Sequence, residues 1–142
     1  MSRTSSSPAG YSGTPLPKKL GIKPGSVVAL VSAPRGFRRT LGKLPAGARL
    51  RARADSRCTL TLWFTRSRPD LGRGIRKAVA LAAQGSVWII WPKQASGVAT
   101  DLREQVVREA GLAAGLVDYK VCAVDATWSG LLFARRKSAK RP

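Results

Sequence analysis

Short apolar runs that alternate with segments of helical periodicity constrain this chain more than any other feature of its sequence. Val, Leu, Ile and Trp dominate each run, as is typical of strands that are buried on both faces of a parallel sheet. Parallel strands must be joined by crossover connections, which are usually helices. We therefore expect a mostly parallel sheet with helices on both faces. The three runs are residues 26–32, 58–65 and 86–91.

Two longer segments have the periodicity of amphipathic helices. Residues 68–83 follow Ser67, a candidate N-cap, and residues from about 100 to 114 follow Thr100 or Asp101 as the cap. In both segments the apolar positions recur at spacings of three and four, which places them on one helical face. These positions are Leu71, Ile75, Val79 and Ala82 in the first segment and Leu102, Val106, Val107 and Ala110 in the second.

The remaining elements complete an α/β order. Short helices are expected near the N-terminus and after the first strand. Residues 49–53 alternate arginine with apolar residues, so we expect a strand near a sheet edge there. Two final strands joined by Asp125-Ala126-Thr127 predict an antiparallel hairpin. The short helices cover residues 14–20 and 37–43, and the hairpin strands cover residues 117–124 and 128–134.

The length of 142 residues and the apolar fraction of 44% are sufficient for one core. We expect a single domain at residues 14–134, with a flexible tail at 1–13 and a basic tail at 135–142. The N-terminal segment has no apolar core of a secretory signal, and no apolar run approaches the ~20 residues of a membrane helix. We therefore expect a cytoplasmic protein without a membrane partner.

The chain has 26 Lys and Arg residues against 7 Asp and Glu residues, a formal net charge of +19. Such a charge attracts polyanions, and nucleic acid is the abundant polyanion of a cell. A basic composition of the whole proteome is the alternative explanation for the excess. Aromatic residues do not interleave with the basic ones, so we expect contacts to phosphate only. The candidate phosphate contacts are Arg49, Arg51, Arg53, Arg135, Arg136 and Lys137.

Ligands of open α/β sheets bind beyond the carboxyl ends of the strands, and several polar residues follow the expected strands there. The loop at residues 93–101 is the sharpest candidate, because a helix that begins near Thr100 would direct free N–H groups at an anion. Thr100 and Asp101 acting only as helix caps is the alternative. Asp125 and Lys93 could form an acid/base pair, or an ion pair between the hairpin and this loop. A hydrogen bond between Asp125 and its own turn is the favoured alternative. The candidate ligand-binding residues are Arg35, Gly36, Lys93, Ser96, Gly97, Asp125, Thr127 and Trp128.

Several kinds of catalytic site are excluded by composition. The chain has no histidine, which excludes serine or cysteine catalysis with a histidine base. Cys58 and Cys122 lie in apolar surroundings far apart in sequence, so they suggest neither a disulfide framework nor a metal site. We expect both cysteines to be buried as small apolar residues.

Three segments resemble a bacterial family known only as a domain of unknown function, which implies no activity for this chain. They are residues 10–22 (GYSGTPLPKKLGI), 91–102 (WPKQASGVATDL) and 121–131 (VCAVDATWSGL).

The order of elements also resembles a Rossmann-like methyltransferase sheet, which ends in a helix and an antiparallel pair of strands. That resemblance implies a glycine-rich loop after the first strand and an acidic residue after the second. Here Ser32-Ala33-Pro34-Arg35-Gly36 has one glycine, and Asp55 is the only acid near the second position. We therefore do not expect S-adenosylmethionine to bind.

These observations favour a non-catalytic, Rossmann-like module that binds an anionic small molecule or partner at the carboxyl edge of its sheet. A basic protein that binds nucleic acid without sequence preference is a second hypothesis. A degenerate methyltransferase-like enzyme is the third. The sequence identifies neither the ligand nor the oligomeric state.

Overall fold

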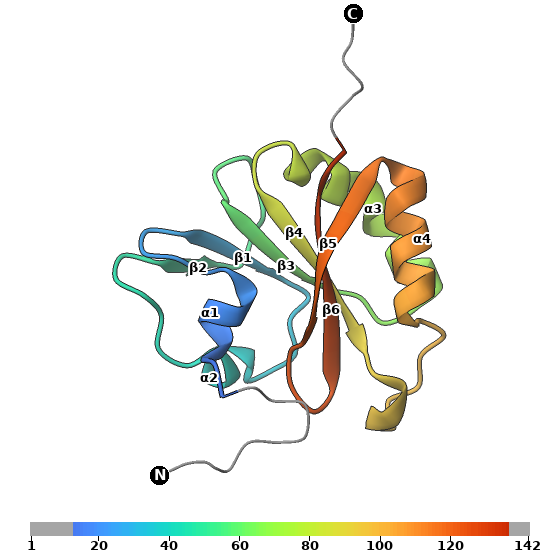
Figure 1. The fold of residues 1–142 in the computed structure, drawn as a ribbon, viewed down its shortest axis with the longest axis horizontal. Coiled ribbons are helices and arrows are strands. Elements are labelled where there is room, and N and C mark those ends of the chain that lie inside the picture. The colour runs from blue at the N-terminus through green and yellow to red at the C-terminus, as the bar shows by residue number, and fades with distance from the viewer. Residues whose placement is uncertain (1–12, 137–142) are drawn as a thin grey trace, which may run out of the picture.

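The computed structural model describes residues 13–136, which form one six-stranded sheet with helices on both faces (Figure 1). The strand order is β2-β1-β3-β4-β6-β5. The first four strands in this order are parallel, and β6 is antiparallel to both of its neighbours, which confirms the predicted α/β sheet and closing hairpin. The strands are β1 (Val27–Val31), β2 (Arg49–Arg51), β3 (Leu60–Phe64), β4 (Ser86–Pro92), β5 (Leu116–Ala123) and β6 (Trp128–Arg135).

Helices cover the sheet from opposite sides, with α1 and α2 against one face and α3 and α4 against the other. Helix α3 begins as predicted, because the Ser67 hydroxyl accepts a hydrogen bond of 3.2 Å from the backbone N–H of Asp70. The helices are α1 (Leu16–Leu20), α2 (Phe37–Leu41), α3 (Arg68–Ala82) and α4 (Glu104–Ala114), with a short 3₁₀ turn, η2 (Gln94–Ser96), after β4.

The core consists of two main apolar layers that share β3 and β4. All five residues of β3 are buried. Its alternate side chains therefore enter opposite layers: Leu62 and Phe64 face α1 and α2, while Trp63 faces α3. The Trp88 indole N–H donates a buried hydrogen bond of 2.9 Å to the carbonyl of Leu20, which fixes the end of α1 on the sheet.

The connection from β2 to β3 crosses β1 without a helix. The segment of residues 52–59 passes over the α3 side of β1, where Ala54 and Cys58 pack against Ala29. Small side chains allow this close approach of an extended segment to the sheet. We call residues 52–59 the crossing segment.

Asp55 holds the turn of the crossing segment. Its carboxylate accepts a hydrogen bond of 2.9 Å from the backbone N–H of Arg57 and an ion pair of 3.1 Å from the Arg51 guanidinium. The hydrogen bonds from Arg57 and the positive charge of Arg51 lower the pKa of Asp55 below its ordinary value of 3.8.

Some predicted boundaries differ from the structure. Helix α4 begins at Glu104, after Arg103 as its N-cap residue, and not near Thr100. The Thr100 hydroxyl donates to the carbonyl of Arg66, and the Asp101 carboxylate accepts from the backbone N–H of Arg68. Both side chains therefore bond to the start of α3, which lies more than 30 residues away in sequence.

Two further boundaries also differ at the ends of the described chain. Helix α1 begins at Leu16, with Pro15 at the N-cap position, and not at residue 14 as predicted. The predicted basic tail joins the fold at its start, because β6 extends to Arg135 and Arg136 bonds the end of α4. The rest of that tail and residues 1–12 of the predicted N-terminal tail lie outside the described residues.

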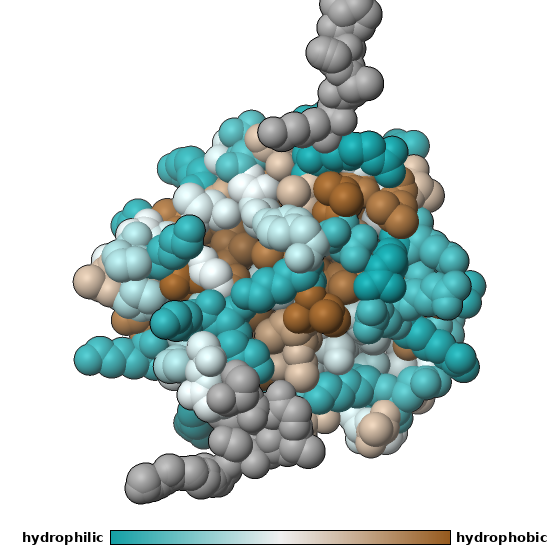
Figure 2. Space-filling view, viewed as in Figure 1, coloured by the Kyte–Doolittle hydropathy of each residue, from teal (hydrophilic) through white to brown (hydrophobic). Residues whose placement is uncertain are grey.

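Strand β5 forms one edge of the sheet and carries a stripe of exposed apolar side chains. Val117, Tyr119 and Val121 are 39%, 56% and 55% exposed. The pairing of β5 with β6 shifts register between Asp118 and Lys120, so the edge strand is irregular at its centre. Apolar patches separated by polar side chains are visible on this face of the molecule in Figure 2.

Gly111→Ala tests the close packing of α4 on the sheet. A Cβ atom at Gly111 would lie 2.3 Å from the Phe133 ring, which is fully buried, so the ring or the helix would have to shift. We expect this substitution to lower the free energy of unfolding by about 1–3 kcal/mol in urea denaturation. Gly72→Ala in α3 is the matched control, because its Cβ would meet nothing within 4 Å. The control should raise the free energy of unfolding by about 0.5–1 kcal/mol. Equal effects of the two substitutions would contradict the close packing of α4 on Phe133.

Asp55→Asn tests the charge that holds the crossing segment. Because folding lowers the pKa of Asp55, its charge stabilises the protein above the unfolded-state pKa, and this stabilisation is lost as the pH falls through the folded-state pKa. Wild type should therefore be more stable than the variant near neutral pH, and the difference should narrow below about pH 4. Thermal denaturation at a series of pH values measures the stability difference between wild type and variant. A difference that does not change with pH would contradict the proposed role of the Asp55 charge.

Candidate functional site

The loops that follow β1, β3 and β4 meet at the carboxyl edge of the sheet, together with the turn between β5 and β6 (Figure 1). The chain leaves β1 toward β2 on one side, while β3 pairs with β1 on the other. This reversal of direction is where open α/β sheets bind ligands. The turn after Ser32 and the stretch after Trp91 lie on this same edge, two strand spacings or roughly 10 Å apart.

An aromatic cluster supports this edge. The rings of Phe37 and Phe64 lie 4.8 Å apart, and those of Phe64 and Trp128 lie 5.1 Å apart, both in edge-to-face arrangements. These residues come from α2, β3 and β6, so the cluster joins three separate parts of the chain. The Arg66 guanidinium lies 5.1 Å above the Trp128 ring, in the range of a cation–π interaction. The aromatic cluster therefore positions the Arg66 guanidinium over the Trp128 ring.

Thr65, next to Arg66, is fully buried and polar. Its backbone N–H donates a hydrogen bond of 2.8 Å to the carbonyl of Ile90, but its hydroxyl has no hydrogen-bond partner among the described residues. A buried hydroxyl without a partner costs about 1–3 kcal/mol. Such groups in folded proteins require an explanation, and a bound water or ligand is the usual one.

The hairpin turn is organised by Asp125. Its carboxylate accepts hydrogen bonds of 2.8 Å from the N–H of Thr127 and 2.9 Å from the N–H of Trp128. The backbone N–H of Lys93 donates to the carbonyl of Thr127 at 2.8 Å, which joins the loop after β4 to the turn. Asp125 therefore bonds its own turn. No ion pair joins it to Lys93 among the described residues.

The loop after β4 differs from the predicted anion cradle. The Ser96 hydroxyl donates to the carbonyl of Lys93 at 2.6 Å and accepts from the N–H of Val98. Gly97 has a φ of 83°, which closes the 3₁₀ turn η2. Because α4 starts only at Glu104, no helix N-terminus points at Ser96 and Gly97. The loop remains a place for polar contacts, without the helix dipole that the sequence suggested.

The predicted ligand-binding residues fall into two groups. Lys93, Thr127 and Trp128 come together with Asp125 where the loop after β4 meets the hairpin. Gly36 instead lines a separate cavity of about 480 Å³ beside the turn after β1, and the exposed Arg35 lies in the same turn. Lys93 and Trp128 do not line that cavity. Sequence spacing identified the common edge but not this division.

The predicted phosphate-binding arginines do not form one free face. Arg49 is exposed on edge strand β2, whereas Arg51 is in an ion pair of 3.1 Å with Asp55. Arg53 lies in the crossing segment, beyond the end of β2. Arg135 and Arg136 lie at the end of β6, three strand positions from β1 and four from β2, and Arg136 donates to the carbonyl of Leu112. Lys137 lies outside the described residues.

Each of the seven Asp and Glu side chains has a partner within the described residues. The acids of the helices and of β5 form ion pairs or side-chain hydrogen bonds. The acids of the turns accept hydrogen bonds from backbone N–H groups. None of these partners is the side chain of Arg35, Arg53, Arg66, Lys77 or Lys93, so these five cations are without a carboxylate in the described structure. The seven acids are Asp55, Asp70, Asp101, Glu104, Glu109, Asp118 and Asp125.

The cysteines are buried and unpaired, as predicted. Burial raises the pKa of the Cys122 thiol, although nearby lysines such as Lys19 oppose this effect. A neutral, buried thiol is a poor nucleophile. Within residues 13–136, no group of three or more His, Cys, Asp or Glu side chains is placed to hold a metal ion. No helix in this part of the chain is long and apolar enough to span a bilayer.

The fold is similar to that of two solved methyltransferase structures. A putative type 11 methyltransferase from Sulfolobus solfataricus superposes with a TM-score of 0.58 and 14% identity, covering 89% of this chain and 93% of that one. A putative tRNA (m1A22) methyltransferase from Streptococcus pneumoniae gives a TM-score of 0.52 and 8% identity, covering 85% and 68%. At such identities the likeness establishes a Rossmann-like, methyltransferase-like fold and not an activity. A search of the curated proteins gave no match.

The residues at this edge differ from the two features that the resemblance to methyltransferases implies. A carboxylate after the second strand would have to hold the ribose hydroxyls, but Asp55 is bonded to Arg51 and to Arg57. The turn after β1 contains Pro34 and reaches a positive φ at Ser32 and at its single glycine, Gly36. Residues 32–36 therefore hold one glycine in place of a glycine-rich loop, and the acid near the end of β2 is bonded within the crossing segment.

The predicted resemblance to a family without an assigned activity is confirmed. The match covers more than half of the chain and includes two of the three segments that carried the resemblance, at residues 91–102 and 121–131. The third segment, at residues 10–22, precedes it. Residues 50–137 match the family described as a protein of unknown function, DUF3052, and the chain belongs to that family.

Proposed function

We propose that this chain is a non-catalytic module that binds an anionic small molecule at the carboxyl edge of its sheet. The observation that carries this proposal is the Arg66 guanidinium, which lies 5.1 Å over the Trp128 ring and has no carboxylate partner among the described residues. A planar guanidinium with free donors is suited to a carboxylate or phosphate group.

The surroundings of Arg66 support the same ligand chemistry. The partner-less hydroxyl of Thr65 adjoins it in sequence and offers a polar group that an ordered water or ligand oxygen would satisfy. Lys93 follows β4, the next strand in the sheet, and its backbone is bonded to the hairpin that carries Trp128. Its positive charge therefore belongs to the same edge. The nearby acids Asp101 and Asp125 bond backbone N–H groups, so neither neutralises these cations through an ion pair.

The chemistry available at this edge favours binding over catalysis. The chain has no histidine, and its thiols are buried. Asp125 uses its carboxylate to hold its own turn, where it accepts hydrogen bonds from two backbone N–H groups. The arrangement supplies positive charge and orientation but no evident nucleophile or general base.

Arg66→Gln tests the proposed site. AMP, citrate and inorganic phosphate serve as probes of three anion shapes in isothermal titration, with S-adenosylmethionine added to examine the methyltransferase alternative. We expect at least one anion to bind, Arg66→Gln to weaken that anion about tenfold, and S-adenosylmethionine not to bind. Arg76→Gln is the matched control, because Arg76 is exposed on α3 and forms no ion pair within residues 13–136. Absence of binding by all three anions, or equal affinity of the two variants, would contradict the proposal.

Nucleic-acid binding is the second candidate, favoured by the excess of 26 basic over 7 acidic residues. A charge-driven complex loses affinity steeply as the salt concentration rises, because counterions are released on binding. Titration of a DNA duplex at several salt concentrations would measure this slope. Arg66→Gln and Arg76→Gln should then weaken binding equally, unlike the result expected for a small anion.

A further inference from the structure

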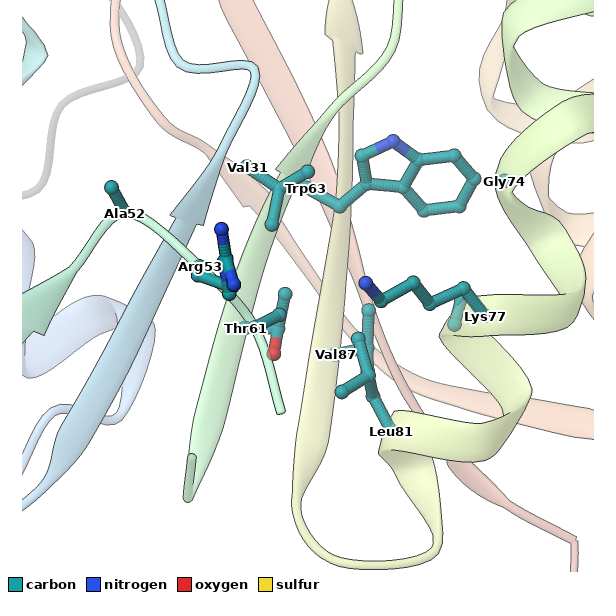
Figure 3. Close-up of a pocket in the computed structure, with 11 residues that line it drawn as sticks. Val31, Ala52, Arg53, Thr61, Trp63, Gly74, Lys77, Leu81 and Val87 are labelled. Carbon is teal, nitrogen blue, oxygen red and sulfur yellow. The ribbon is translucent and has the colours of Figure 1, made fainter. Parts of the chain in front are cut away.

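A second cavity lies on the opposite face of the sheet from the aromatic cluster, between the crossing segment and α3. Its volume is about 240 Å³. Figure 3 shows its floor, made by strands β1, β3 and β4, with α3 along one side and Arg53 of the crossing segment on the other. The lining residues are Val31, Ala52, Arg53, Ala54, Thr61, Trp63, Gly74, Lys77, Ala78, Leu81 and Val87.

The cavity follows from how the chain connects β2 to β3. A helix would place a cylinder about 10 Å wide on this face of the sheet, but the crossing segment is extended and packs close through Ala54 and Cys58. Trp63 fills part of the remaining space, because its indole contacts α3 at Gly74, where a Cβ atom would lie 2.3 Å away. The region between the crossing segment, Lys77 and Leu81 stays open.

The walls of this cavity are apolar and its mouth is cationic. Trp63, Val87 and Ala78 are buried, and the floor contains one polar side chain, Thr61, which is 2% exposed. Lys77 extends from α3 over the cavity, opposite Arg53 (Figure 3).

Both cations at the mouth are without a carboxylate. Neither Arg53 nor Lys77 forms an ion pair in the described structure. The nearest acid along the crossing segment, Asp55, is bonded to Arg51 and to Arg57. Two cations over an apolar cavity therefore attract an anionic group and leave an apolar space beneath it.

We propose that this cavity binds a small amphipathic anion, with an aromatic body against Trp63, Leu81 and Val87 and a carboxylate between Lys77 and Arg53. The size is appropriate, because an apolar cavity of about 150 Å³ already accepts a benzene-sized molecule, and this one has about 240 Å³. The site is separate from the proposed anion site at the carboxyl edge, since Arg66 and Trp128 do not line it.

2-Naphthoate is the probe of choice, because it combines a two-ring apolar body with one carboxylate. We expect binding with a dissociation constant below about 1 mM in isothermal titration. The amide resonances of Thr61, Gly74 and Lys77 should shift in NMR titration. Neutral 2-naphthamide should bind about tenfold more weakly, and acetate should not bind, because affinity requires both the apolar body and the charge.

Lys77→Gln and Arg53→Gln should each weaken 2-naphthoate about tenfold. Both side chains are exposed, so neither variant is expected to unfold the protein. Arg76→Gln, one residue before Lys77 and outside the lining, is the matched control and should leave the affinity unchanged.

Arg66→Gln separates this inference from the proposed function, since it should impair the carboxyl-edge site alone. Unchanged 2-naphthoate affinity in Arg66→Gln is the expected result. The inference is overturned if 2-naphthoate does not bind, if Lys77→Gln has no effect, or if the shifted resonances belong to the carboxyl edge.

Discussion

The burial of β3 on both faces is the constraint on which the rest of this structure depends. A strand whose five residues are all buried must have a layer of side chains above and below it. The parallel pairing of β3 with β1 and β4 then requires connections that return over the sheet, and these connections bring α2 and α3 to opposite faces. Because the parallel strands end at one edge, their loops share that edge without any further interaction to gather them.

The scarcity of negative charge explains where a ligand could be recognised. Seven carboxylates serve turns, helix starts and a few ion pairs, and each has a role in the fold. Positive side chains that remain without such partners are found at the carboxyl edge and at the mouth of the cavity beside α3. Arg66 is oriented by an aromatic ring, whereas Lys77 and Arg53 stand over an apolar floor. The excess positive charge thus occurs in two environments: one beside an aromatic ring at the carboxyl edge, and one over an apolar cavity.

Much of the fold could be predicted from local patterns, and the candidate sites could be predicted only in part. The strands and α3 follow from apolar periodicity and from a cap at Ser67 that bonds within its own turn. The start of α4 was mispredicted because Thr100 and Asp101 have the composition of a local cap but bond to residues 66 and 68.

Contacts between distant parts of the chain explain the remaining omissions. The Arg66–Trp128 contact joins the loop after β3 to the start of β6, across β4, and no spacing rule describes it. The cavity depends on the thickness of the crossing segment, which is a property of packing and not of any motif. The alternation of arginines at residues 49–53 predicts contact with phosphate for all three. In the structure Arg51 forms an ion pair with Asp55, and Arg53 lines the cavity beside α3.

The exposed edge of β5 has a consequence for how copies of this chain coexist. An edge strand offers unpaired backbone groups, and Val117, Tyr119 and Val121 add apolar surface beside them, which together form a template for another strand. Mutual repulsion between molecules of charge +19 keeps such templates apart at low ionic strength. Salt shortens the range of that repulsion to about 10 Å at 0.1 M. Concentrated, salty solutions therefore weaken the electrostatic protection against edge-to-edge association, and the irregular centre of β5 remains as the other protection.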